Sequence, residues 1–164
     1  MNSENSNKTK HVIVAKVDNK PGVVSRMSGF FTRRGYNIES FVTSVTDNPA
    51  IYHLTISVLC SEDEAQLLIH QLGRLAEIIE VCDTADKDVI IREFMLLKIS
   101  CPNEKSFEIL QTCDMLKLKI VGRNEESATI EVMGNSQKLD DVIITFEKYG
   151  IIEIVRSGAV CVVN

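Results

Sequence analysis

Residues 18–40, DNKPGVVSRMSGFFTRRGYNIES, contain the breaks and the periodicity that decide the fold of the first half of the chain. The tetrapeptide Asn19-Lys20-Pro21-Gly22 ends an extended run, and a proline here suits the start of a helix. Apolar residues then recur at helical spacing, at positions 23, 24, 27, 30 and 31. Gly35 provides a left-handed end for that helix, and residues 36–46 read as extended. The stretch therefore predicts a turn, a helix and a strand.

The flanking segments complete a β-α-β-β-α-β order. Residues 11–17, HVIVAKV, are β-branched and strand-like, and residues 52–58 alternate apolar and polar side chains after an Asp-Asn-Pro turn. Residues 61–64, SEDE, have the pattern of a capping box. An apolar helical face follows them, and residues 78–82 read as a short strand. The first half therefore predicts two helices and four strands.

The second half repeats this order. A charged stretch at residues 84–90 predicts a linker, and strands are expected at residues 92–100, 118–122, 128–133 and 151–156. One helix is expected to turn Phe107, Leu110 and Cys113 inward, and another has Leu139, Val142, Ile143 and Phe146 on one face.

We therefore predict an α+β fold of two tandem ferredoxin-like domains, residues 11–84 and 85–164, behind a disordered leader at residues 1–10. Each domain would have one sheet face without helices and a free edge strand, which predicts an oligomer.

Composition excludes several classes of protein. The chain has 164 residues, a formal net charge of −5, 45% hydrophobic and 25% charged residues, which is ordinary for a globular protein. No apolar run approaches the ~20 residues that cross a bilayer, and residues 1–10 lack the pattern of a signal or import peptide. The five cysteines, at positions 60, 82, 101, 113 and 161, are odd in number and widely spaced. They predict neither disulfides nor a metal site, and a reducing cytoplasm fits best.

The sequence shows no constellation of catalytic residues. His11 is expected to be exposed at a strand start, His53 to lie on the polar face of its strand, and His70 on the solvent side of its helix. No nucleophile, zinc or nucleotide-binding motif is found. We therefore expect no catalytic and no metal-binding residues.

RNA binding and acyl-phosphate hydrolysis are two other functions of ferredoxin-like folds. RNA binding needs aromatic residues on the central strands and a basic rim, and this chain is acidic with few aromatics. Acyl-phosphate hydrolysis needs an arginine in the loop after the first strand, where this chain has only Lys20. RNA binding is disfavoured, and the second activity remains an alternative.

The loop before the first helix is the best candidate for a ligand site. Unpaired amides and the helix dipole at this end suit a small carboxylate, and Gly22 would let the ligand approach the backbone. Asn19 lies in the loop, and Asn37, after the turn at Gly35, could accept a hydrogen bond from an ammonium group. The alternative, which the pattern alone favours, is that both asparagines only satisfy turns.

Residues 18–40 closely resemble the signature of the small regulatory subunit of acetolactate synthase, whose first half is an ACT domain. Three further stretches are similar to the same family: QLGRLAEIIEV, REFMLLKI and the terminal RSGAV. The resemblance implies a subunit without catalytic residues that activates the large catalytic subunit and confers feedback inhibition by a branched-chain amino acid, usually valine. It places the cofactors thiamine diphosphate, Mg²⁺ and FAD in the large subunit alone. A free-standing amino-acid sensor without an enzyme partner is the alternative.

The resemblance also implies roles for individual residues at a homodimer interface. Asn19 and Gly22 would hold the effector, with the amides of Val23 and Val24 facing its carboxylate. Asn37 and Ile38 would come from the second protomer, and Ile38 would pack on the aliphatic side chain. The preferred amino acid, the surface that meets the large subunit and any ligand of the second domain stay open.

The chain departs from the family at residues 52–54. The family commonly has Ser-Arg-Met there, and this chain has Tyr-His-Leu. Because His53 is only a partial, pH-dependent substitute for arginine, we expect the response to effector or the contact with the large subunit to differ.

Overall fold

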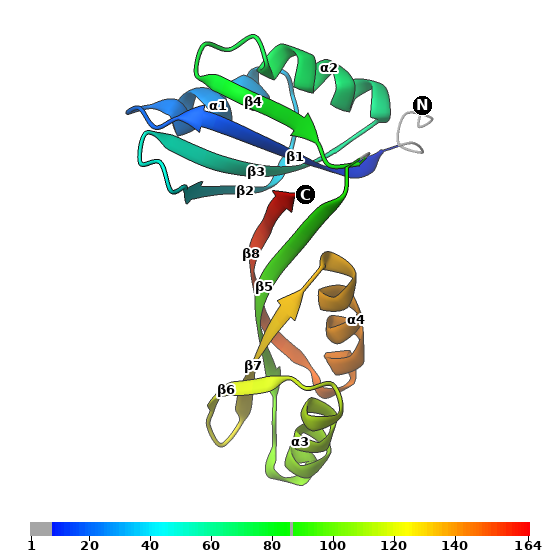
Figure 1. Ribbon diagram of the computed structural model, residues 1–164. Helices are drawn as coiled ribbons and strands as arrows, with labels where there is room; N and C mark the ends of the chain where they lie inside the picture. Colours follow the sequence, from blue (N-terminus) through cyan, green and yellow to red (C-terminus); the bar gives the residue numbers. More distant parts are fainter. Residues whose placement is uncertain (1–7, 86) are drawn as a thin grey trace, which may run out of the picture. The chain divides into compact units, whose positions relative to one another are not determined.

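The structure is a computed structural model that describes residues 8–85 and 87–164. It confirms the β-α-β-β-α-β order in both halves, with two additional short 3-10 helices (Figure 1). The elements of the first half are β1 (Thr9–Asp18), α1 (Val23–Arg33), β2 (Ile38–Val45), β3 (Ile51–Cys60), α2 (Glu62–Leu72) and β4 (Ile78–Asp83). Those of the second half are β5 (Val89–Ser100), η1 (Asn103–Lys105), α3 (Ser106–Met115), β6 (Lys119–Arg123), β7 (Ser127–Gly134), α4 (Ser136–Phe146), η2 (Glu147–Tyr149) and β8 (Ile151–Val163).

The chain forms two compact units, each with its own core. The first comprises the described residues through Ile90 together with Gly158–Asn164, and the second is Ile91–Ser157. The sequence had predicted a single second domain at residues 85–164. The structure instead groups the last seven residues with the first unit, and we call them the C-terminal segment.

The first unit is an antiparallel sheet with strand order β2-β3-β1-β4. Helices α1 and α2 both lie over one face of this sheet (Figure 1). Alternate residues of the central strands, such as Ile13, Ala15 and Leu54, pack beneath the helices and are almost fully buried. Their neighbours, including Val14 and His53, face the opposite side, because successive side chains on a strand alternate between its faces. We call this opposite side the open face.

The second unit repeats the architecture with strand order β6-β7-β5-β8. Met95, Leu97 and Ile99 of β5 pack against α3 and α4 and are fully buried. Helix α4 buries Leu139 and Phe146 as predicted. Both units are therefore ferredoxin-like, in agreement with the predicted fold class. No helix in the described part of the chain is long and apolar enough to cross a membrane.

Two predictions about burial were wrong. Phe107 is 78% exposed and Leu110 is 40% exposed, whereas Cys113 of α3 is buried as expected, together with Ile109. His11, which was expected at the surface, is buried, with only 4% of its surface exposed. Its Nδ1 lies 2.8 Å from the Asp83 carboxylate. Helix α3 has apolar residues on two sides, and periodicity cannot say which side is buried. The partner of His11 lies 72 positions away in the sequence.

Candidate functional site

The loop between β1 and α1 is held by the turn between β2 and β3. The backbone N–H of Asn19 donates to the carbonyl of Ala50 at 2.8 Å, and its Nδ2 donates to the carbonyl of Pro49 at 2.8 Å. Asn19 therefore stabilises this turn, as the alternative without a ligand predicted. Its carbonyl oxygen Oδ1 accepts no hydrogen bond from the described residues, so it can accept one from a ligand.

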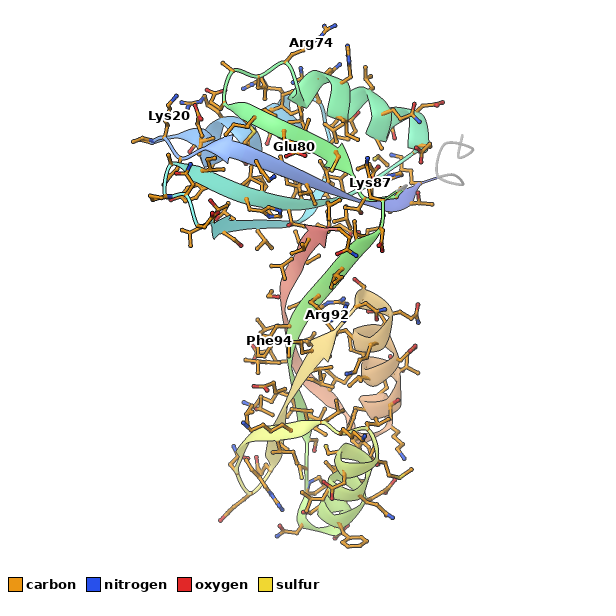
Figure 2. All side chains as sticks on the ribbon, viewed as in Figure 1. Lys20, Arg74, Glu80, Lys87, Arg92 and Phe94 are labelled. Atoms are coloured by element: carbon orange, nitrogen blue, oxygen red, sulfur yellow. The ribbon has the colours of Figure 1, made fainter. Side chains whose placement is uncertain are left out.

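Lys20, the other polar side chain of this loop, lies at the same end of the first unit (Figure 2). Its ammonium group contacts the carboxylate of Asp18 at 2.5 Å. An acyl-phosphate site in this loop would depend on the positive charge of Lys20, which Asp18 neutralises. The geometry thus gives the acyl-phosphatase alternative no support.

Helix α1 begins without a cap of its own. Gly22 precedes it with φ of 84°, a left-handed conformation that favours glycine, and no side chain caps the helix or places an acid in its first turn. By contrast, α2 is capped by Ser61 and Glu64, which bond to each other's backbone N–H. The first amides of a helix have no acceptor within it, and the dipole makes this end positive. The start of α1 therefore suits an anionic ligand.

The two valines that follow Gly22 differ in burial and in whether the backbone N–H already has an acceptor. The N–H of Val23 donates to the carbonyl of Lys20 at 3.1 Å, and its side chain is 1% exposed in the core. Val24 is 41% exposed at the surface. Of the two amides that the sequence singled out, that of Val24 is the one left for a carboxylate.

The other predicted residues lie where α1 ends and β2 begins. Asn37 is exposed after the turn at Gly35, and Ile38 starts β2 and packs against the core. A cavity of about 250 Å³ lies here, lined by Lys8, Arg34, Gly35, Tyr36, Asn37, Glu39, Leu59 and Glu64. The Tyr36 hydroxyl donates to the Glu64 carbonyl at 3.4 Å, and burial, followed by the Glu64 charge, raises the pKa of Tyr36.

Sequence reasoning missed Arg34 at this cavity. Its guanidinium lies 3.7 Å from the centre of the Phe30 ring and also donates to Gln71 of α2. These contacts fix a positive charge three residues before Asn37. The only signal for it was the second arginine in the run that precedes Gly35.

The residues predicted to bind the effector thus lie in two groups, which we call half-sites, at opposite ends of one helix. Asn19, Gly22 and Val24 lie at its start, and Asn37 and Ile38 follow its end. Helix α1 has 11 residues and is about 16 Å long. One chain therefore cannot bring both half-sites to one small molecule.

The three histidines lie in different surroundings, and His11 contacts the Asp83 carboxylate through Nδ1 at 2.8 Å and the Thr9 hydroxyl through Nε2 at 3.1 Å. His70 is exposed on α2 as predicted, and no cluster of three or more His, Cys, Asp or Glu placed to bind a metal occurs among the described residues. His53 is half-buried on the open face of the sheet, and burial, followed by the charge of Lys16, lowers its pKa. Its neighbours Tyr52 and Leu54 belong to the core. The departure from the family pattern therefore changes the open face at His53.

Comparisons with known proteins agree with the fold. The family described as "AHAS small subunit-like ACT domain" matches residues 13–80, and that described as "Small subunit of acetolactate synthase" matches residues 92–164. A protein of Archaeoglobus fulgidus, "Probable acetolactate synthase small subunit", is 36% identical over 94% of this chain and 97% of its own length. The acetolactate synthase small subunit of Mycolicibacterium smegmatis is 32% identical over 93% of this chain and 89% of its own.

A solved structure also matches across both units. The crystal structure of the acetolactate synthase small subunit from Thermotoga maritima is 28% identical and superposes with a TM-score of 0.81. It covers 95% of this chain and 98% of the other. The fold and the family match at residues 13–80 define an ACT-domain protein, in which a second ferredoxin-like unit follows the ACT domain. Within that class, the chain belongs to the family of acetolactate synthase small subunits.

Proposed function

We propose that this chain activates the large catalytic subunit of acetolactate synthase and makes it sensitive to feedback inhibition by a branched-chain amino acid, with valine as the effector. The observation that carries the proposal is the pair of half-sites at the two ends of α1 in an ACT fold. The names of the relatives support a large partner, because a small subunit implies one. Thiamine diphosphate, Mg²⁺ and FAD belong to that partner in this proposal.

Together, the two half-sites offer partners for the carboxylate, the ammonium group and the side chain of an amino acid. The positive start of α1 suits the carboxylate of the ligand at the amide of Val24, and the Oδ1 of Asn19 can accept from its ammonium group. Asn37 and Ile38 of a second protomer would add a polar contact and an apolar surface. The half-sites are about 16 Å apart along α1, so a homodimer with two antiparallel α1 helices would complete the site.

A site made by two protomers gives the effector a means of regulation. Ligand binding and dimer geometry then become one equilibrium, because only the paired arrangement offers the complete site. The large subunit responds if it contacts the two dimer geometries differently, and the coupling is reciprocal. This is the physical requirement for feedback through a subunit that has no catalytic residues.

Reconstitution with a catalytic subunit tests the proposal. The purified chain should raise the activity of the large subunit, and valine should then lower it. A chain that neither binds nor alters the large subunit overturns the proposal. Pull-down from a cell extract separates it from a free-standing sensor, since only the regulatory subunit should retain a large thiamine-dependent companion.

Substitution of Asn37 by alanine should weaken effector binding while preserving the fold. Asn37 is exposed, so its replacement disturbs no core contact, but the loss of a polar partner costs roughly 1–3 kcal/mol. Isothermal titration with valine should show a dissociation constant raised by about 5- to 150-fold. An unchanged constant in a well-folded dimer would exclude Asn37 from the site.

A further inference from the structure

The C-terminal segment, Gly158–Asn164, packs on the open face of the first sheet. Gly158 has φ of 80°, and a Cβ there would lie 2.8 Å from the Cβ of Ser40 and 2.9 Å from the Cγ2 of Val42. At the other end, the backbone N–H and the Nδ2 of Asn164 donate to the carbonyl and the carboxylate of Asp88, at 2.9 and 3.0 Å. The segment is therefore fixed to the first unit at both ends.

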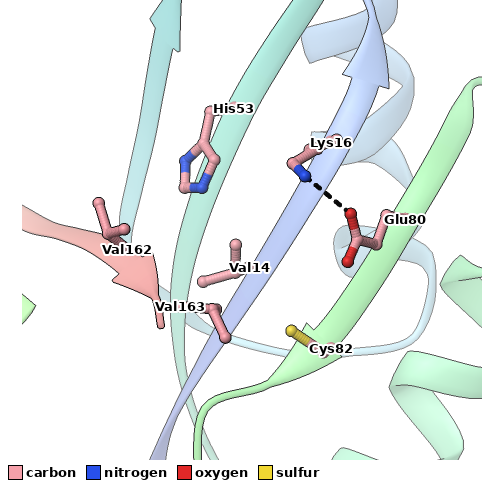
Figure 3. A pocket seen from close by; sticks show the side chains of 7 residues that line it. All are labelled: Val14, Lys16, His53, Glu80, Cys82, Val162 and Val163. Carbon is pink, nitrogen blue, oxygen red and sulfur yellow. Dashed lines mark hydrogen bonds and ion pairs between the residues drawn. The ribbon is translucent and has the colours of Figure 1, made fainter. Parts of the chain in front are cut away.

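Between these two anchors the segment closes a cavity. The cavity has a volume of about 220 Å³ (Figure 3). It is lined by Val14 and Lys16 of β1, His53 of β3, Glu80 and Cys82 of β4, and Val162 and Val163 of the C-terminal segment. It shares no residue with either half-site of α1.

The strand register explains why these side chains meet. Lys16 lies opposite His53 on one side and opposite Glu80 on the other, so the three form one polar row across the sheet. Val14 and Cys82 form the adjacent, less polar row. The cavity therefore has a charged end and an apolar end, and the two valines of the C-terminal segment extend the apolar part.

The charged end presents one positive and one negative group. The ammonium of Lys16 lies 2.9 Å from the carboxylate of Glu80, and both side chains are about half exposed, at 49% and 62%. Exposed ion pairs are weak, so a ligand that offers each group a new partner can open this pair easily. Burial and the Lys16 charge lower the pKa of His53, which keeps its imidazole neutral near pH 7 and able to donate or accept a hydrogen bond.

We propose that this cavity is a second ligand site, which binds a small aliphatic α-amino acid as its zwitterion. The carboxylate of the ligand pairs with Lys16, its ammonium pairs with Glu80, and its side chain lies against Val14, Val162 and Val163. The site goes beyond the effector site proposed above and does not depend on it, because the two have no residue in common.

Size and charge favour this class of ligand over others. A cavity of about 150 Å³ holds benzene, so about 220 Å³ accommodates a small aliphatic amino acid. Typical sites for larger ligands begin near 300 Å³. A 2-oxo acid or a simple carboxylate would occupy Lys16 and leave Glu80 as an unpaired negative charge beside it. A zwitterion keeps both charges paired.

The test uses the full-length chain with Gly22→Asp, which is designed to remove binding at the start of α1. Equilibrium dialysis should show that this variant retains one L-valine site per chain. Lys16→Met in the same background should weaken that site at least tenfold, and Glu80→Gln should weaken it similarly. The 2-oxo acid with the valine side chain should bind at least tenfold more weakly than valine. The matched control is Lys148→Met, which breaks an exposed Lys–Glu pair in the second unit and should change nothing.

A second measurement locates the ligand. Cys82 is the one described cysteine that is only partly buried, so its thiol should react first with an alkylating reagent, and valine should slow that reaction. Absence of saturable binding in Gly22→Asp, or equal binding in Lys16→Met, overturns the cavity site. If wild-type protein binds valine only in a Gly22-sensitive way, the cavity proposal fails and the effector site stands. If wild-type protein binds no valine, both fail.

Discussion

A Gly22→Asp variant is expected to activate the catalytic subunit but no longer respond to valine. The new carboxylate would lie at the start of α1, where the carboxylate of the effector is proposed to bind, and like charges so close exclude each other. The backbone at Gly22 has φ of 84°, which costs an ordinary residue about 1–2 kcal/mol and aspartate somewhat less. The fold should therefore survive while binding at this site falls below detection in isothermal titration.

Two control variants separate charge from backbone strain. Gly22→Ala adds a Cβ, which would lie 3.3 Å from the Nη1 of Arg26, but adds no charge, so it should retain weakened binding. Gly150→Asp places the same residue at another glycine with positive φ, 90°, in the second unit, and should leave the valine response intact. Full valine sensitivity in Gly22→Asp would remove the start of α1 from the site.

The fold followed from local patterns because each helix and most strands have their own signals. The capping box at Ser61 and Glu64 predicted the start of α2, and both of its hydrogen bonds are present. The predicted strand at residues 151–156 began correctly but continues to Val163 as β8. The predicted strand ended two residues before Gly158. In the structure it lets the chain pass close to Ser40, a contact that no local pattern encodes.

The stripe on α1 shows the limit of periodicity. Val23, Met27, Phe30 and Phe31 are buried as expected, but Val24 is 41% exposed. Adjacent residues on a helix point about 100° apart, and the position of the sheet decides that Val23, and not Val24, faces the core. That choice matters for function, because it leaves Val24 at the surface beside the proposed ligand.

The two sites differ in how far the sequence could reveal them. The residues of each α1 half-site are close neighbours in the chain, so the loop motif together with the family resemblance was enough to propose them. The open-face cavity depends on the register among Lys16, His53 and Glu80 and on a segment more than 70 positions away. His53 was placed on the polar face of its strand and noted as a departure from the family, but its partners became visible only with the strand pairing.

An Arg156→Met variant is expected to lose a large part of the stability of the second unit. The Nε and Nη2 of Arg156 donate to the two carboxylate oxygens of Glu93 at 2.9 and 2.7 Å, and its Nη1 donates to Asp140 at 2.6 Å. Glu93 is 5% exposed and Arg156 is 27% exposed. These hydrogen bonds, with Glu93 as the main contributor, raise the pKa of Arg156.

The expected loss of stability comes from the Glu93 carboxylate, which stays buried after Arg156 is replaced. Removing one partner of a buried ion pair leaves the other charge poorly compensated and costs about 3–5 kcal/mol. Because Arg156 is partly exposed, we expect about 3 kcal/mol, measured as a lower free energy of unfolding in urea. The hydroxyl of Ser136 still donates to Glu93 at 3.2 Å, but a neutral hydroxyl does not supply the charge of a bidentate guanidinium.

A double-mutant cycle distinguishes this ion pair from a simple loss of packing. Glu93→Leu combined with Arg156→Met removes both charges, so the double variant should be more stable than Arg156→Met alone. Lys148→Met breaks the exposed pair with Glu108 on the same unit and should leave the free energy of unfolding nearly unchanged, since surface pairs contribute little. Additive losses in the cycle would mean that Arg156 stabilises the unit through a partner other than Glu93, such as Asp140. A coupled result would show that Glu93, in the REFMLLKI stretch, and Arg156, in the RSGAV stretch, stabilise the second unit as a pair.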